Sequence, residues 1–279
     1  MEKTNIFKKI FRIINKFLLI AFAKIIAVPL KFLGIKIIPP YDEIKNFQYH
    51  FSEETRRLIL KPKKNNSFNK IFVDTSLNSS LLCNLGSEKY PTNKSPYHEG
   101  FRSGFTGFYN LLFTNLRDKK INFAEIGIEK NDSIKMWREF FSEATIHAFD
   151  IDEEKIENAK KHNLDRTFYH KINVAIENSI VDGFKRTECK FDVIIDDSTH
   201  DFEAQVRVVK NCNQFLKKNG ILIIEDIYKH EKKHSESNYY NSLKDIKNLF
   251  SDVVFIETSH VNNYTGGWKN EKILLLIKN

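Results

Sequence analysis

The chain has 279 residues, enough for one large domain with an appendage or for two small domains, and 41% of them are hydrophobic. Its formal net charge is +8, but residues 1–40 hold eight Lys or Arg against one Glu, so most of the excess lies there. The remainder is close to neutral, which argues against a nucleic-acid groove in the folded body.

Residues 5–23 are predicted to form a basic amphipathic helix, with Lys8, Lys9, Arg12 and Lys16 on one face and Ile and Phe on the other. Its uncharged stretch, residues 17–23, is far too short to span a bilayer. We expect a peripheral membrane contact through residues 5–23, at the inner face of the membrane of a cytoplasmic protein. A helix packed on protein and a cleaved signal peptide are the alternatives.

The next two segments are predicted to be irregular. Residues 41–75 are polar and mixed, as in a surface loop or linker. Residues 76–116 combine Gly and Pro with aromatic side chains, a composition that suits a lid or substrate loop, or an ordinary surface connection. Cys83, Cys189 and Cys212 stand in no C-x-x-C spacing, which favours a reducing compartment and thiols that serve as small core side chains.

From residue 121 onward, short apolar runs alternate with helical patterns. The predicted strands are 121–126, 145–149, 167–170, 191–195, 221–224, 253–257 and 272–277. The predicted helices between them are 132–141, 153–161, 202–217 and 242–249. This alternation indicates an α/β fold with a parallel sheet and right-handed crossovers, and the last two strands, which have no helix between them, are expected to pair antiparallel.

Carboxylates follow two of these strands. Residues 191–200 read Phe-Asp-Val-Ile-Ile-Asp-Asp-Ser-Thr-His, so Asp196, Asp197 and His200 come at the end of a strand buried on both faces. The strand at 221–224 likewise ends in Glu225 and Asp226. Open α/β sheets bind ligands at the carboxyl ends of their strands, so this pairing predicts a divalent-metal site.

The first two strands of this series predict a nucleoside-binding edge. Glu125 and Gly127 end the first strand, and Asp132-Ser133 are expected to cap the next helix. Asp150 ends the second strand, where a carboxylate can accept hydrogen bonds from a ribose, or can serve as a turn residue. There is no G-x-G-x-x-G, so a ligand with a ribose but no phosphate, such as S-adenosylmethionine, fits better than a dinucleotide.

Several stretches resemble class I S-adenosylmethionine-dependent methyltransferases, and within them the metal-dependent sugar O-methyltransferases of macrolide biosynthesis. They are residues 133–141 with 144–152, residues 191–200, residues 220–226, and residues 90–97, which are similar to a Tyr-Gly-Thr-Asp-Lys element of that family. The resemblance covers about residues 80–279. It implies a Rossmann-like seven-stranded sheet, mostly parallel with an antiparallel last strand, preceded here by an N-terminal helical extension.

The resemblance also implies roles for individual residues. Asp197, Glu225 and Asp226 would bind Mg²⁺ or another divalent cation, and His200 would be the general base. The expected S-adenosylmethionine contacts are Glu125, Gly127, Ser133, Asp150, Asn173 and Asp196. Chelation acidifies and orients a sugar hydroxyl, and a neighbouring imidazole can take its proton, so the residue types suit this chemistry.

The chain departs from the family pattern at four places. Glu129 stands where many relatives have a second glycine, and Asn173 where an Asp often contacts adenine. Asn93 replaces the Asp of the upstream element, and Ser103 replaces a His. These differences leave two other interpretations open: a metal protein with oxidising chemistry, resembling cephalosporin hydroxylase-like proteins, and a non-catalytic binding or scaffold protein.

The prediction is therefore an O-methyltransferase that acts on a sugar hydroxyl or vicinal diol of a small molecule or glycan, such as a surface-polysaccharide precursor. Residues 1–40 would form the basic N-terminal segment, residues 41–116 the linker and lid, and residues 117–279 the methyltransferase domain. No nucleic-acid partner is expected, and a homo-oligomer remains an open alternative.

Overall fold

Eight strands form one mixed sheet in the computed structural model, which describes residues 67–76 and 80–279. The order across the sheet is β1-β7-β8-β6-β5-β2-β3-β4, and β8 is antiparallel to both of its neighbours while the other pairs are parallel. The strands are β1 (Asn69–Asp74), β2 (Asn122–Ile126), β3 (Thr145–Asp150), β4 (Thr167–Lys171), β5 (Phe191–Asp196), β6 (Leu216–Ile224), β7 (Phe250–Ser259) and β8 (Lys272–Lys278).

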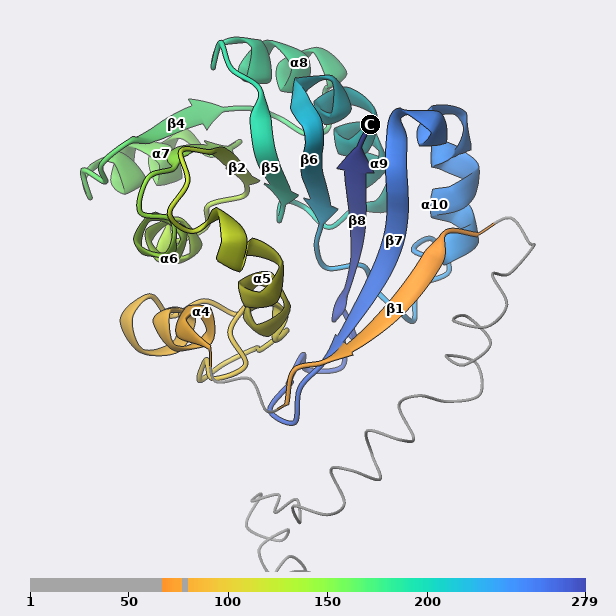
Figure 1. The fold of residues 1–279 in the computed structure, drawn as a ribbon, viewed down its shortest axis with the longest axis horizontal. Helices are drawn as coiled ribbons and strands as arrows, with labels where there is room; N and C mark the ends of the chain where they lie inside the picture. The colour runs from red at the N-terminus through yellow and green to blue at the C-terminus, as the bar shows by residue number, and fades with distance from the viewer. Residues whose placement is uncertain (1–66, 77–79) are drawn as a thin grey trace, which may run out of the picture. The chain divides into compact units, whose positions relative to one another are not determined.

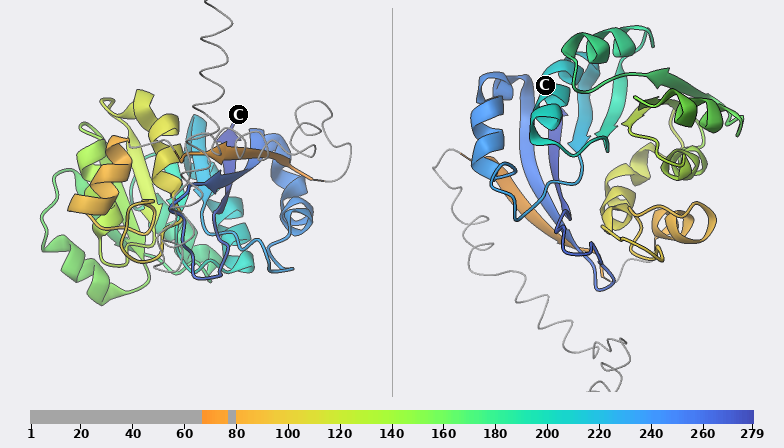
Figure 2. Two further views of the ribbon diagram at one scale, coloured as in Figure 1. Left: turned by 90° about the horizontal axis from the view of Figure 1, so that it is seen from below. Right: turned by 180° about the vertical axis from the view of Figure 1, so that it is seen from behind.

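Helices cover both faces of the sheet (Figures 1 and 2). One core cluster contains apolar side chains of α8, α9 and α10, and the other contains those of α4, α5, α6 and α7. The helices are α4 (Leu81–Asn84), α5 (Phe105–Phe113), α6 (Asp132–Phe140), α7 (Glu153–Lys160), α8 (Glu177–Lys185), α9 (Phe202–Cys212) and α10 (Glu236–Leu243). A π-helical turn (Leu85–Lys89) and three 3₁₀ turns (Thr114–Leu116, Asn213–Phe215 and Lys244–Leu249) complete the set.

The position of strand β5 in the sheet explains why apolar and polar residues do not alternate along its sequence. Ile194 packs in the core cluster on one face, and Val193 and Ile195 pack in the cluster on the other, and all three are fully buried. A central parallel strand covered on both faces has no solvent side, so successive residues must all be apolar. Apart from Asp192 at the start of the strand, polar residues can therefore appear only where the strand ends, at Asp196 and beyond.

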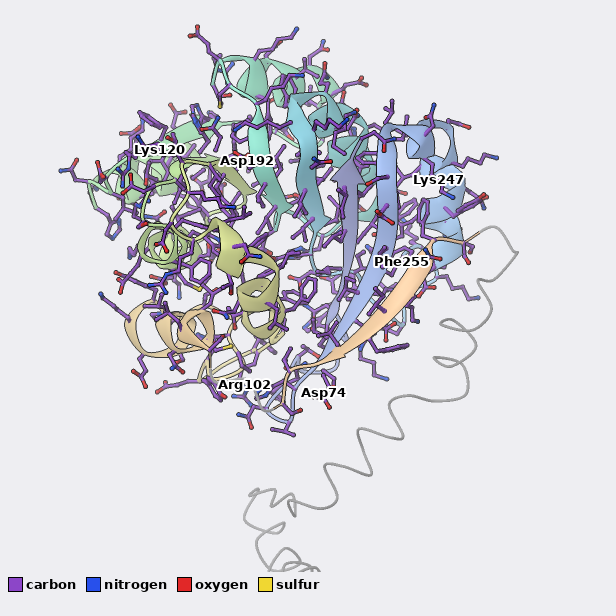
Figure 3. The ribbon with its side chains drawn as sticks, viewed as in Figure 1. Asp74, Arg102, Lys120, Asp192, Lys247 and Phe255 are labelled. Atoms are coloured by element: carbon purple, nitrogen blue, oxygen red, sulfur yellow. The ribbon has the colours of Figure 1, made fainter. Side chains whose placement is uncertain are left out.

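The chain reverses its direction of travel across the sheet between β2 and β5. It runs outward from β2 through β3 to β4, and then returns to β5 on the other side of β2. The carboxyl ends of β2 and β5 therefore border the crevice where such sheets bind ligands. Asp74, at the carboxyl end of β1, lies at this end of the sheet with Arg102, whereas Asp192, at the start of β5, lies at the opposite end (Figure 3).

All seven predicted strands are present, and the antiparallel pairing of the last two is confirmed. The sheet has one strand more than predicted, because β1 lies within the segment 41–75 that was expected to be irregular. This short strand is polar at both ends and, among the described residues, pairs only with β7, as an edge strand can. Strand β8 lies between β6 and β7, so β1 and not β7 forms that edge.

The helices predicted at 132–141 and 153–161 are found as α6 and α7, and the other two predictions differ from the structure. The helix predicted at 202–217 ends at Cys212, and β6 begins at Leu216. The helix predicted at 242–249 was placed too late, because α10 ends at Leu243 and a 3₁₀ turn follows it. Helices α4, α5 and α8 were not predicted. The three cysteines are free, and two of them, Cys83 and Cys212, are buried. Within residues 67–76 and 80–279, no helix is long and apolar enough to cross a membrane. The predicted helix at 5–23 lies outside the described residues.

Candidate functional site

The carboxyl ends of β5 and β6 bring the predicted acidic residues together. Main-chain hydrogen bonds join Asp197 N to Ile126 O at 2.8 Å and Glu225 N to Asp196 O at 2.9 Å, so the three strands β2, β5 and β6 end in register. Side chains that leave these ends at successive residues then point to different sides. The result is an acidic cluster with two separate sets of contacts.

The first set is an open group made of Asp197, His200 and Asp226, whose ligand atoms all lie within 4.8 Å of one another. His200 Nε2 lies 3.4 Å from Asp226 Oδ2 and 3.9 Å from Asp197 Oδ1. Asn270 orients the group by donating to Asp226 Oδ1 at 2.8 Å. His200 and Asp226 both have positive φ angles, of 55° and 54°, in a backbone region that costs energy for residues other than glycine and often marks functional sites.

The second set is a closed group centred on Lys94. Its Nζ donates to Asp197 Oδ2 and to Glu225 Oε2, and lies 3.5 Å from Glu125 Oε1. The side chains of Lys94, Glu125 and Glu225 are at most 1% exposed. Tyr109, on α5, donates to the other oxygen of Glu225 at 2.7 Å. Lys94 is therefore a buried ammonium that neutralises part of a buried acidic cluster.

The electrostatics of the two groups follow from burial and from this lysine. Burial alone would lower the pKa of Lys94, but the surrounding carboxylates outweigh it and raise the pKa well above its usual value. Burial raises the pKa of Asp226 to about 6, against the opposing effect of His200. Burial likewise raises the pKa of Asp196 to about 6, against the hydrogen bond that Ser198 donates. The cluster thus carries more carboxylates than its lysine can balance.

Residues 90–104 lie over this edge of the sheet and bring Lys94 to it. The segment folds back on itself, because Ser103 N donates to Asn93 O at 2.8 Å and Thr106 N donates to Lys94 O at 3.1 Å. Arg102 ties it to the loop before β8 through a two-way main-chain pairing with Tyr264. The predicted lid region therefore contains a segment fixed at both Arg102 and Lys94.

A cavity of about 630 Å³ adjoins the open group. Its volume lies in the range of small-molecule and cofactor sites. Its walls come from residues 90–104 (the lid segment), the turn after β2, the ends of β3 and β4, and the loop after β5. The residues discussed below that line it are Asn93, Phe101, Gly127, Glu129, Ser133, Asp150, Lys155, Asn173, Asp197 and His200. The cavity runs from the predicted nucleoside edge to the predicted general base.

Gly127 and Asp150 form the turns at the nucleoside edge. Asp150 Oδ2 accepts from Ile128 N at 3.0 Å and its Oδ1 accepts from Asp152 N at 2.9 Å, so one carboxylate holds the turns after β2 and β3. Gly127 has φ of 96°, and an added Cβ would lie 2.0 Å from Asp197 O. The glycine was expected to allow a ligand close to the backbone; the structure shows that it also allows Asp197 there.

The other predicted cofactor residues divide into two sets. Ser133 and Asn173 line the cavity, and Asn173 Oδ1 accepts from Ala175 N at 2.9 Å. Glu125 and Asp196 lie behind the cavity wall that the described residues form. Glu125 is buried and accepts from Trp137 Nε1, and Asp196 accepts from Ser198 Oγ at 2.6 Å. The structure thus places these two carboxylates where they support the turns that surround the cavity.

Two local details differ from the predictions. Asp132 and Ser133 were expected to cap α6, but the N-cap residue is Asn131, which has φ of 69° and, among the described residues, makes no side-chain capping bond. Ser133 instead lies near Glu125, where its hydroxyl acts to lower the pKa of this carboxyl against the larger effect of burial. Glu129, the departure from the glycine pattern, is paired with Lys155 at 2.7 Å, so its negative charge at the cavity edge is offset.

The donor set of the open group suits a divalent cation. Its two carboxylates are oxygen ligands that such ions accept, and Mg²⁺ in particular retains positions for water and substrate oxygens. His200 Nδ1 and Asp196 Oδ2 are buried and have no hydrogen-bond partner within the described residues. Glu225, predicted as a ligand with Asp197 and Asp226, has both oxygens engaged by the closed group. Its role as a metal ligand remains a prediction.

Sequence reasoning did not identify Lys94 or Tyr109 as parts of the site. Lys94 lies in the element at residues 90–97, and Tyr109 is one of the aromatic residues of the predicted lid region, residues 76–116. The Lys94–Glu225 contact joins residues 131 positions apart. Nothing local distinguishes this lysine from an exposed one. The one available signal was the resemblance of residues 90–97 to the Tyr-Gly-Thr-Asp-Lys element, in which Lys94 matches the lysine.

Three comparisons relate the chain to known proteins. A family model described as a methyltransferase domain matches residues 129–273. A search of curated proteins finds no match. Among solved structures, the MycE methyltransferase from the mycinamycin biosynthetic pathway in complex with Mg, SAH and mycinamycin VI has a TM-score of 0.52 at 19% identity, over 71% of this chain and 54% of that chain.

A second structure of MycE, in complex with Mg and SAH, has a TM-score of 0.53 at 18% identity, over 72% of this chain and 55% of that chain. At these identities the likeness shows a shared fold. The present chain spans about half of the length of the MycE chains.

Proposed function

The chain belongs to the methyltransferase-domain family, and on that premise we propose that it is an S-adenosylmethionine-dependent, cation-assisted O-methyltransferase acting on a sugar hydroxyl or another vicinal diol. One observation carries the proposal: a single cavity runs from the turns at Gly127 and Asp150 to His200 and Asp197. The residues expected to bind a nucleoside and those expected to bind a cation thus line one chamber.

The cofactor end of the cavity fits a nucleoside. Asp150 has two oxygens, each with one hydrogen bond from the backbone, and a carboxylate has lone pairs left to accept from a ribose diol. Ser133 and Asn173 add polar atoms along the wall. S-adenosylmethionine would supply an electrophilic methyl group on a sulfonium sulfur, which is chemistry that no side chain provides.

The open group fits the acceptor end. Asp197 and Asp226 would hold the cation, which would acidify and orient two neighbouring hydroxyls of the acceptor. His200 lines the cavity, and its Nε2 can take the proton from the hydroxyl whose oxygen is methylated. The carboxylates at 3.4 and 3.9 Å then stabilise the positive charge on the ring.

A titration with S-adenosylhomocysteine, followed by calorimetry with and without Mg²⁺, tests this function. The native chain is expected to bind both, and Asp197→Ala to retain S-adenosylhomocysteine while losing Mg²⁺. Absence of heat with S-adenosylhomocysteine under both conditions would favour a non-catalytic scaffold. Transfer of a labelled methyl group to a panel of glycosides then tests the acceptor class, and oxygen-dependent turnover without transfer would contradict it.

We propose further that residues 5–23 bring the enzyme to a membrane surface, where a lipid-linked glycan or surface-polysaccharide precursor would be the acceptor. The support is the basic amphipathic pattern of this segment. Deletion of residues 1–40 is expected to move the protein from the membrane fraction to the soluble fraction. An unchanged partition would remove this part of the proposal and leave the chemistry of the site untouched.

A further inference from the structure

Lys94 lies where an acidic cluster would otherwise be expected to hold a metal ion. Its side chain is 1% exposed, and its ammonium group contacts oxygens of Asp197, Glu225 and Glu125, which come from the ends of three neighbouring strands. Three carboxylates that converge on one point are the oxygen-rich surroundings that divalent cations prefer. Here a compact point charge from the protein itself occupies that position.

Asp197 is shared between this position and the open group. Its Oδ2 accepts from Lys94, and its Oδ1 faces His200 Nε2 at 3.9 Å. Each oxygen is therefore assigned to one side of the cluster. A cation on the open side can use Oδ1 of Asp197 together with Asp226, while the space between Asp197 and Glu225 is already filled.

Glu225 is fixed in the same way. Oε2 accepts from Lys94, Oε1 accepts from Tyr109 at 2.7 Å, and Gln205 Nε2 donates to the main-chain oxygen of this residue at 2.9 Å. Glu125 has a buried oxygen, Oε1, that has no hydrogen-bond partner within the described residues, and the Lys94 ammonium is 3.5 Å away. Removal of the lysine charge would therefore leave three carboxylates facing one space, two of them fully buried.

We propose that Lys94 is a built-in cation, a positioning residue that excludes a divalent ion from the space between Glu125, Asp197 and Glu225 and so confines the ion to the open group. The inference deepens the proposed function and rests on it, because it concerns where the catalytic cation can bind. Lys94 is held at this position by the main-chain hydrogen bond from Thr106 N to Lys94 O at 3.1 Å. The prediction is that loss of the lysine creates a second cation site.

The test is the number of Mn²⁺ ions bound by the full-length protein, measured by the loss of the free-ion electron paramagnetic resonance signal and by calorimetry. Lys94→Ala is expected to bind one Mn²⁺ more than the native chain. Lys94→Arg, which keeps the charge, is expected to bind the native number. The double variant Lys94→Ala/Glu225→Gln is expected to lose the additional ion, because it lacks one of the three carboxylates.

Lys89→Ala is the matched control, since Lys89 precedes the same segment but forms an exposed ion pair with Glu139. It is expected to bind the native number of ions. An equal number and equal affinity in the native chain and in Lys94→Ala overturns the proposal. The native number itself tests the proposed function, so a native chain that binds no Mn²⁺ argues against that function, while a gain in Lys94→Ala still supports this inference.

A lysine variant that is unfolded in the absence of divalent ions also tests the proposal. If Lys94→Ala unfolds, Lys94→Gln is the second variant, and its thermal unfolding is followed with Mn²⁺ and with K⁺ as a monovalent control. Recovery of the fold by Mn²⁺, and not by K⁺, supports replacement of the ammonium by a divalent ion. Failure of Mn²⁺ to restore either variant overturns the proposal, because the space then has a purely structural need for the lysine.

Discussion

The two halves of the acidic cluster use the same residue types for opposite purposes. In the closed half, the side chains of Lys94, Glu125 and Glu225 are at most 1% exposed, and the lysine charge is bound. In the open half, the side chains of Asp197 and His200 are 19% and 26% exposed and border the cavity. Glu225 and Asp226 are consecutive in the chain, yet they belong to different halves.

The backbone explains this division. Glu225 follows the last residue of β6 and still points into the protein, whereas Asp226 has φ of 54°, which turns its side chain toward His200. A carboxylate at a strand end is therefore not in itself evidence of a ligand site. What decides its role is whether a buried countercharge already occupies its oxygens.

The largest effect is expected from the open half. His200→Gln is expected to lower the rate of methyl transfer by about 10² to 10⁴-fold, because a positioned general base contributes about that factor. S-adenosylhomocysteine affinity should not change, since the nucleoside edge is intact. Transfer of label from S-adenosylmethionine and calorimetry measure the two quantities. A drop in affinity that equals the drop in rate would show that His200 only shapes the cavity.

Substitution of the lysine in the closed half should lower the stability of the protein. Lys94→Met is expected to lower the free energy of unfolding by about 3–5 kcal/mol, the typical result of removing one partner of a buried ion pair. Urea unfolding without divalent ions measures it, and Lys89→Met, an exposed lysine of the preceding turn, should show no measurable change. A loss as small as that of the control would mean that the closed half does not depend on its lysine.

The nucleoside edge lies outside both halves, so a substitution there should change cofactor binding without changing cation binding. Asp150→Asn is expected to weaken S-adenosylhomocysteine binding by about 10 to 100-fold, as expected for loss of hydrogen bonds to a charged acceptor. Mn²⁺ binding should keep its native affinity. Calorimetry with each ligand checks both statements. Equal weakening for both ligands would instead indicate that the turn held by Asp150 supports the whole site.

The smallest effect concerns pH and comes from the sheet. Burial lowers the pKa of His147, on β3, from 6.5 to about 4. Between pH 4 and pH 6.5 the unfolded chain therefore binds a proton that the folded chain does not, so stability is fully present above pH 6.5 and falls as the pH drops toward 4. His147→Gln is expected to show a flatter decline in urea unfolding across this range. If the decline of stability with falling pH were the same in His147→Gln as in the native chain, another group would be responsible for the acid sensitivity.

Much of the fold could be predicted because it follows from local patterns. The apolar residues of β5 and the carboxylates that follow it are adjacent in the chain, so the sequence alone placed Asp197 and Asp226 at one edge. Strand β1 was missed because a six-residue edge strand with polar ends resembles a loop. Lys94 was missed as a site residue because its burial results from contacts with residues more than 100 positions away.

The predictions for Gly127 and Asp150 were incomplete in a similar way. Gly127 was interpreted through a bound nucleoside, and Asp150 either through a ribose or as a turn residue. In the structure each also has a partner within the protein, Asp197 O for Gly127 and two backbone N–H groups for Asp150. Such contacts between turns depend on the register of neighbouring strands, which a single sequence does not specify.

The contact between Gly127 and Asp197 has a thermodynamic consequence. The turn that forms one ligand site and the residue that begins the other touch through their backbones, with no space for a Cβ between them. Ligands at the two sites should then share a coupling free energy, which by reciprocity is the same whichever binds first. Each of S-adenosylhomocysteine and Mn²⁺ should therefore change the affinity of the other by one common factor.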